Sequence, residues 1–121
     1  MPRVIALPTG NGSNTLRDFK NLLLLNHQSN YLLEVDNIVF ALETYGFQIN
    51  REYKRESLKK LGTDLYELRI KRIRLFVYFD VNDFFVLLHG FIKKTQQTPL
   101  KELRLAKEEI RKWKNMKERH S

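Results

Sequence analysis

Apolar residues recur along the chain at two spacings, one typical of helices and one typical of strands. Residues 3–7 are rich in β-forming side chains and end in the turn-forming residues 8–12, which predicts a short first strand and a loop. Two segments with apolar residues at helical spacing follow, at 13–27 and 29–46. The first part of the chain therefore predicts a strand followed by a helical hairpin.

The next part of the chain has the pattern of strands. Three segments rich in aromatic and β-branched residues, joined by a basic corner at 71–72 and a turn at 80–83, are residues 65–70, 73–79 and 84–92. Short turns between such segments predict an antiparallel meander. Residues 47–60 are polar and predict an irregular connection.

A last helix is expected after Thr98-Pro99, because threonine suits the N-cap and proline suits the first turn. Its apolar stripe consists of Leu100, Leu103, Ala106, Ile110 and Trp113. Residues 1–121 thus predict a single α+β domain with a short N-terminal strand, a helical hairpin, a three-stranded antiparallel meander and a C-terminal helix.

Strand alternation places two arginines and two aromatic rings on one face of the expected sheet. Arg69 shares this face with Arg74, Phe76 and Tyr78, while the opposite face is apolar and must pack on helices. We expect the first face to be open, where flat rings beside guanidinium groups can stack unpaired bases. The alternative is that Glu67 pairs with Arg69, and that the two rings belong to a second apolar face under the C-terminal helix.

The charge of the chain points to a polyanionic partner. The net charge is +8, and the basic excess begins at Arg51, since residues 1–50 are nearly neutral. Nucleic acids and anionic lipid surfaces are the common polyanions of a cell. A basic amphipathic helix at residues 100–121 would suit a membrane surface, but its narrow apolar stripe favours packing on the domain.

The composition narrows the other functional classes. The chain contains no cysteine, which excludes disulfides and thiolate metal sites. No apolar run approaches the roughly 20 residues of a membrane span, and the first residues lack a secretory signal, so we expect a cytoplasmic protein that contacts no membrane. Three scattered histidines without a carboxylate cluster argue against a zinc site.

Three segments together resemble the phage-related, HigB-like branch of the RelE/ParE toxin superfamily. They are the stretch 61–70 with its run Leu65-Tyr66-Glu67-Leu68-Arg69-Ile70, the stretch 74–79, and the stretch 87–99 with its run His89-Gly90-Phe91-Ile92-Lys93-Lys94-Thr95-Gln96-Gln97-Thr98-Pro99. Glu102 and Ala106 of the last helix extend the likeness. The resemblance implies a RelE-like fold.

The resemblance also implies a function. It suggests the toxin of a type II toxin–antitoxin pair, bound by an antitoxin that is often a small helix-turn-helix protein. Such a toxin enters the ribosome and cleaves messenger RNA without a metal or other cofactor, by attack of a ribose 2′-hydroxyl on the adjacent phosphate. The alternatives are a non-catalytic, ParE-like topoisomerase inhibitor and a degenerate phage protein that only binds an antitoxin.

Site residues follow from the same resemblance. The expected catalytic residues are Arg69, which would orient the RNA, and Arg74 and Lys94, which would stabilise charge on the phosphoryl oxygens. The expected RNA-binding residues are Lys71, Arg72, Phe76, Tyr78 and Lys93.

The general base is the missing part of this expected site. Glu67 lies on the right face, although an ion pair with Arg69 is its favoured role. His89 has the strand parity of a core or sheet residue, and His120 lies at the chain end. A lysine can serve only where neighbouring cations lower its pKa.

Overall fold

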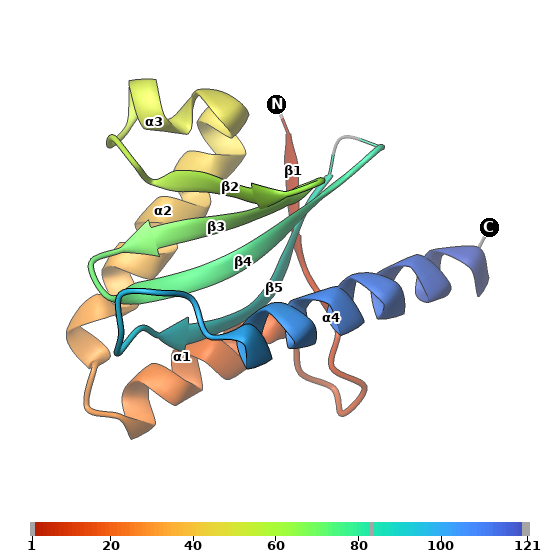
Figure 1. The fold of residues 1–121 in the computed structure, drawn as a ribbon, viewed down its shortest axis with the longest axis horizontal. Coiled ribbons are helices and arrows are strands. Elements are labelled where there is room, and N and C mark those ends of the chain that lie inside the picture. The colour runs from red at the N-terminus through yellow and green to blue at the C-terminus, as the bar shows by residue number, and fades with distance from the viewer. Residues whose placement is uncertain (1, 83, 120–121) are drawn as a thin grey trace.

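A five-stranded sheet is the framework of the fold, with helices on both of its faces (Figure 1). The computed structural model describes residues 2–82 and 84–119, so Asp83 of the expected turn at 80–83 lies outside the described residues. In chain order the elements are β1 (Arg3–Ala6), α1 (Thr15–Leu25), the 3-10 turn η1 (Ser29–Tyr31), α2 (Leu32–Tyr45), the 3-10 turn η2 (Gly46–Gln48), α3 (Ile49–Glu52), β2 (Leu58–Gly62), β3 (Leu65–Ile70), β4 (Ile73–Asp80), β5 (Phe84–Ile92) and α4 (Leu100–Arg119).

The strands lie in the order β1-β5-β4-β3-β2. β1 runs parallel to β5, with Arg3 beside Phe84, and every other neighbouring pair is antiparallel. The α+β class expected from the sequence is confirmed. The expected first strand is present as β1, beside β5, whereas β2 was not expected and adds a further strand at the opposite edge.

β2 lies in the segment that the sequence predicts to be irregular. Within it Leu58 is buried, whereas Lys59 and Lys60 are exposed. An edge strand needs few apolar residues, and exposed lysines protect such an edge from pairing with other chains. The strand therefore has no hydropathy signal of its own.

Helices α1 and α2 cover one face of the sheet and enclose the larger core (Figure 1). Phe19 of α1 packs so closely on β5 that a Cβ atom placed on Gly90 would lie 2.6 Å from its ring. Because carbon atoms in contact normally lie about 3.5–4.0 Å apart, a residue with a side chain does not fit here. Gly90 thus sets the distance between α1 and the sheet.

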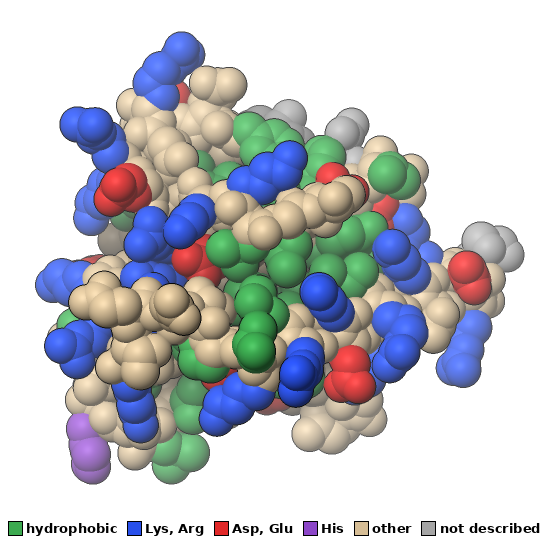
Figure 2. All heavy atoms as spheres, viewed as in Figure 1, with side chains coloured by type: hydrophobic (Ala, Val, Ile, Leu, Met, Phe, Trp, Pro, Cys, Tyr) green, Lys and Arg blue, Asp and Glu red, His purple; other side chains and the backbone are tan. Residues whose placement is uncertain are grey.

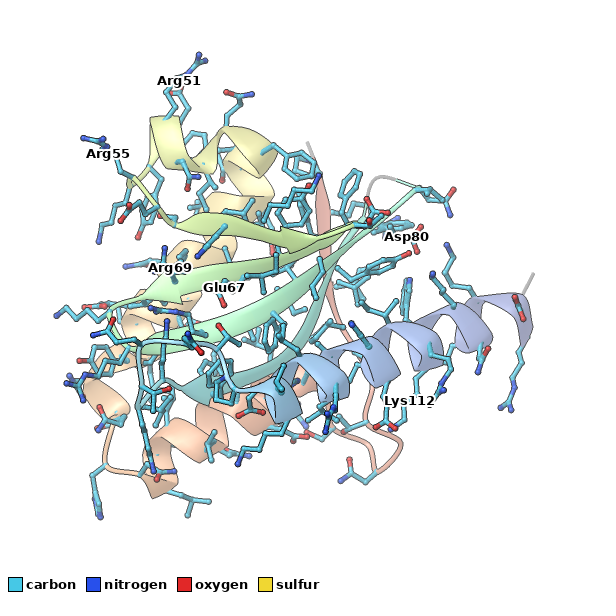
Figure 3. The ribbon with its side chains drawn as sticks, in the orientation of Figure 1. Arg51, Arg55, Glu67, Arg69, Asp80 and Lys112 are labelled. Carbon is cyan, nitrogen blue, oxygen red and sulfur yellow. The ribbon has the colours of Figure 1, made fainter. Side chains whose placement is uncertain are left out.

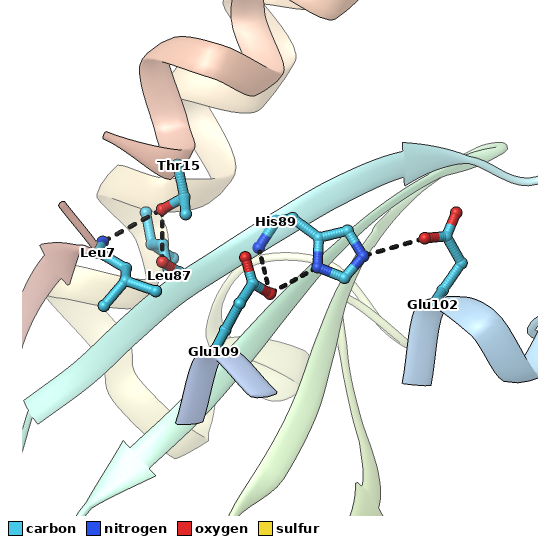
Figure 4. A network of polar contacts seen from close by, with 6 residues as sticks. All are labelled: Leu7, Thr15, Leu87, His89, Glu102 and Glu109. Carbon is cyan, nitrogen blue, oxygen red and sulfur yellow. Dashed lines mark hydrogen bonds and ion pairs between the residues drawn. The ribbon is translucent and has the colours of Figure 1, made fainter. Parts of the chain in front are cut away.

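One side chain ties the first turn of α1 to β5 and to the residue that follows β1. The Thr15 hydroxyl accepts a hydrogen bond from the Leu7 amide at 3.1 Å and donates one to the Leu87 carbonyl at 2.6 Å (Figure 4). Asn14 caps the helix by accepting from the Arg17 amide at 2.9 Å. These bonds fix the loop after β1 against β5.

Helix α4 lies across the other face of the sheet and encloses a second core (Figure 1). Phe76 is fully buried there, and Tyr78 is nearly so, beneath Ala106 and Trp113 of the helix. The expectation that this face is open around the two rings is wrong, because the apolar stripe of α4 needs a partner surface and they provide it. The alternative, a second apolar face under the C-terminal helix, is confirmed.

Asp80 fastens α4 to the end of β4. Its carboxylate accepts a hydrogen bond from the Trp113 indole at 2.6 Å and forms a salt bridge with Lys117 at 2.7 Å. Burial raises the pKa of this carboxyl, but hydrogen bonds from Lys117 and Trp113 outweigh that effect and leave the pKa below its ordinary value.

None of the helices in residues 2–82 and 84–119 combines the length and apolarity that a membrane span requires.

Candidate functional site

Two arginines face each other across the β3–β4 hairpin. The two-residue corner of the hairpin, with Lys71 in the left-handed conformation at φ 52°, sets a register in which Arg69 lies opposite Arg74 and Glu67 opposite Phe76. Like charges directly opposite on an antiparallel pair repel each other. The expected convergence of Arg69 and Arg74 on one face is therefore present, and it requires a compensating group.

Glu67 is that group. Its Oε1 atom lies 3.7 Å from the Nε atom of Arg69 and 3.7 Å from the Nε atom of Arg74. The carboxylate is 2% exposed, whereas the Arg69 side chain is 27% exposed. The ion pair expected between Glu67 and Arg69 is thus present (Figure 3), and the same buried carboxylate also forms a salt bridge with Arg74.

Arg74 is the deeper of the two arginines. Its Nη1 atom donates hydrogen bonds to the backbone carbonyls of Lys71 at 2.6 Å and Ile73 at 3.0 Å. Burial lowers the pKa of its guanidinium, the charge of Arg69 lowers it further, and Glu67 raises it, with a net lowering. Arg74 is therefore held by the hairpin corner, and Arg69 is the arginine that meets solvent.

Two buried atoms near these arginines form no hydrogen bond with any of the described residues. They are Oε2 of Glu67 and Nε of Arg74. Buried polar atoms in folded proteins are nearly always hydrogen-bonded, because an unsatisfied one costs about 1–3 kcal/mol. These two atoms belong to the group formed by Glu67, Arg69 and Arg74, which we call the arginine–glutamate cluster.

A basic cavity of about 350 Å³ adjoins the cluster at Arg69. Lys54 and Arg55 line it from the segment after α3, and Lys71 lines it from the hairpin corner. Figure 2 shows Lys and Arg side chains gathered at this end of the sheet, and Figure 3 shows Arg55 projecting at its rim. Sequence reasoning missed Lys54 and Arg55, for which the basic excess beginning at Arg51 was the available signal.

The basic residues after β5 lie apart from this cavity. The Lys93 amide donates to the Arg72 carbonyl at 2.6 Å, so both residues lie where β4 and β5 pair last. Lys94 lines a separate cavity of about 270 Å³, together with Asn26, the residue just after α1, and Glu102 of α4. The structure does not bring Lys94 into the cavity that Arg69 lines.

The aromatic side chains expected to stack on RNA are enclosed by α4. Phe76 packs against His89 and Phe91, with ring centroids 5.2 and 5.5 Å away. The ammonium group of Lys114 lies 5.7 Å from the Tyr78 ring centroid, and burial, followed by the charges of Asp80 and Asp64, raises the pKa of the Tyr78 hydroxyl. A base-stacking role for these two rings on an open sheet is therefore wrong for this conformation.

His89 lies in a polar network between β5 and α4 (Figure 4). Its Nδ1 atom is 2.6 Å from Oε1 of Glu109, and its Nε2 atom is 3.1 Å from Oε1 of Glu102. Burial lowers the pKa of this imidazole, but the hydrogen bonds and charges of Glu109 and then Glu102 outweigh it, so the pKa is raised. The imidazolium is thereby favoured, and it holds α4 on the sheet.

Sequence reasoning named Glu102 only as part of the family likeness and missed Glu109, the second glutamate of this network. They are seven residues apart on α4, which places both on one face of the helix. No cluster of three or more histidine, aspartate or glutamate side chains in residues 2–82 and 84–119 is arranged to hold a metal ion. His120 lies outside the described residues.

Comparison with known proteins adds a family. Residues 31–111, about two thirds of the chain, match the family model described as Phage derived protein Gp49-like. The matched stretch runs from before α2 into α4 and contains the arginine–glutamate cluster and the basic cavity. No curated protein sequence matches the chain.

Proposed function

Because the chain belongs to the Gp49-like phage-derived family, whose members are RelE-like toxin-type proteins, we propose that it is a toxin that cleaves messenger RNA on the ribosome. The observation that carries this proposal is the arginine–glutamate cluster, in which a cationic pair surrounds a buried carboxylate with an unpartnered oxygen. An antitoxin that binds and neutralises the protein is part of the same proposal.

The proposed reaction transfers a phosphoryl group within the RNA, from the 5′-oxygen of one nucleotide to the 2′-oxygen of the nucleotide before it. The ribose 2′-oxygen attacks the adjacent phosphorus while its proton passes to Oε2 of Glu67, which accepts no hydrogen bond from the described residues. The bond to the 5′-oxygen breaks, that oxygen takes a proton from water, and Glu67 gives its proton to the hydroxide that this leaves. The products are a 2′,3′-cyclic phosphate and a 5′-hydroxyl.

Arginine suits the charge that grows on the phosphoryl oxygens, because its planar fork meets phosphate bidentately and stays charged. Arg69 is the partly exposed member, so it makes the first contact with the phosphate. Arg74 adds charge from below and holds Glu67 in place. Since Glu67 is 2% exposed, the proposed reaction requires the side chains around it to move when RNA enters.

The test is primer extension on messages from a translating extract that contains the purified protein. We expect new 5′-hydroxyl ends that depend on translation, and a loss of cleavage on the order of 10²–10³-fold in Arg69→Ala. Glu67→Gln removes the proton acceptor and keeps the shape, so it should also abolish cutting. Lys112→Ala is the control. This exposed lysine of α4 lines a different cavity, together with Pro8 and Gly10.

Intact messages at a high dose of protein would overturn the proposal. A parallel assay of DNA supercoiling by gyrase separates the alternative function. Loss of supercoiling with messages intact would assign the protein to the topoisomerase inhibitors.

A further inference from the structure

The basic cavity beside Arg69 has the walls of a nucleotide site. Three segments form it: the start of α2, the connection from α3 to β2, and the end of β3 with its corner. Its lining residues are Glu34, Ile38, Tyr53, Lys54, Arg55, Ser57, Arg69, Ile70 and Lys71. Its volume of about 350 Å³ lies at the small end of the range for ligand pockets, roughly 300–1,000 Å³.

The charges in this cavity are mostly uncompensated. No carboxylate of the described residues lies within 4 Å of the side-chain nitrogens of Lys54, Arg55 or Lys71. Lys54 lies 5.3 Å from the Tyr53 ring centroid, and Lys71 lies 5.6 Å from that of Tyr31. Aromatic faces orient these ammonium groups without neutralising them, so the cavity is prepared for an anion.

Backbone hydrogen bonds hold the segment of Lys54 and Arg55 next to the strand that carries Arg69. The Arg69 amide donates to the Ser57 carbonyl at 2.8 Å, and the Ser57 hydroxyl donates to the Lys54 carbonyl at 2.7 Å. Asn50 clamps the start of β2 through two bonds of 2.8 Å with the backbone of Leu58. Lys54 and Arg55 are therefore carried by a turn that is bonded to β3, beside the strand that bears Arg69.

The cavity also offers an apolar wall. Tyr53, Ile38 and Ile70 line it, and all three belong to or pack against the core beneath α2. Cations beside an aromatic ring are the combination that binds a phosphate and the base or ribose attached to it. The single acidic residue of the lining, Glu34, leaves an excess of positive charge.

We propose that this cavity binds the RNA nucleotide next to the scissile phosphate. Its phosphate contacts Lys54, Arg55 and Lys71, and its base or ribose packs against Tyr53. Arg69 belongs to both the cavity and the arginine–glutamate cluster, so it joins the two positions along one strand of RNA. This inference rests on the proposed function and names a substrate subsite within it.

The experiment measures binding of a short, fluorescein-labelled, single-stranded RNA whose 2′-hydroxyls are methylated, so that it cannot be cut. Fluorescence anisotropy over a range of salt concentrations gives the affinity and its salt slope. We expect Lys54→Ala with Arg55→Ala to weaken binding about tenfold at low salt. The slope should fall by about 0.7 for each phosphate of the single strand that the variant no longer neutralises.

The matched control is Lys59→Ala with Lys60→Ala. This pair removes the same charge from exposed positions of β2 outside the cavity, so its affinity should stay within about twofold of the wild type. Equal weakening by both pairs would overturn the subsite, because it would show only a general effect of charge. Binding to anionic phospholipid vesicles with none to RNA would overturn it as well.

Two results separate this subsite from the proposed function. If the wild type binds the RNA through Lys54 and Arg55 but never cuts messages, the cleavage proposal fails and the subsite stands. If the wild type cuts messages and the Lys54/Arg55 variant binds and cuts as well as it does, the subsite fails and the cleavage proposal stands. Circular dichroism of each variant checks that the fold is retained.

Discussion

Gly90 provides a sharp test of how the sheet and α1 are packed. In Gly90→Ala the added Cβ would lie 2.6–2.7 Å from three ring carbons of Phe19, about 1 Å closer than carbon atoms normally approach. The ring is buried in the larger core, so it cannot rotate into solvent. Overpacking of this kind costs about 1–3 kcal/mol, and we expect the free energy of unfolding to fall by that amount.

Urea unfolding followed by circular dichroism measures the change. Gly62→Ala is the control, because a Cβ there meets nothing within 4 Å and its stability should stay within about 0.5 kcal/mol of the wild type. Gly90→Ala should cost less in a Phe19→Leu background, since the smaller side chain removes the clash. Equal stability of Gly90→Ala and the wild type would refute the packing argument.

Three further outcomes are expected. The raised pKa of His89 contributes stability that is complete below about pH 6.5 and is lost as the pH rises through the folded-state pKa. The loss of stability that urea unfolding measures in His89→Gln should therefore shrink with rising pH. A loss that stays constant from pH 5 to 9 would contradict this reasoning. Asp80→Asn should lower the free energy of unfolding by about 1–3 kcal/mol at pH 7 and shift the fluorescence of the single tryptophan, Trp113, to the red. This loss should vanish as the pH falls through the lowered folded-state pKa of Asp80, because the wild-type carboxylate is then protonated. An unchanged spectrum would count against the anchoring of α4 by Asp80. Glu67→Leu should lower the free energy of unfolding by about 3 kcal/mol, because it leaves Arg74 buried without a counter-charge. Adding Arg74→Met should restore most of this loss. A double variant no more stable than Glu67→Leu would show that the ion pair is not the cause.

The sequence was most informative where structure is local. The helices of the hairpin and α4 follow from apolar spacing, and the pairing of Arg69 with Arg74 follows from strand parity across a two-residue corner. Both depend on residues close together in the chain. The ion pair between Glu67 and Arg69 could be expected for the same reason.

Tertiary packing decided what the sequence left open. Phe76 and Tyr78 have the parity of a solvent-facing surface, but two large aromatic side chains there require a second layer, which α4 supplies. The approach of Lys54 and Arg55 to Arg69 depends on β2, an edge strand with few apolar residues. The bonds of His89 to Glu102 and Glu109 join segments whose proximity no periodicity reveals.

The parallel pairing of β1 with β5 sets the order in which parts of the sheet can form while the chain is being synthesised. Arg3 is made 81 residues before its partner Phe84, which is about 4–16 s earlier at usual rates of elongation. The β3–β4 hairpin can form early because its contacts are local, whereas the sheet closes late. A protein proposed to attack translating ribosomes therefore cannot complete its sheet until its own β5 has been made.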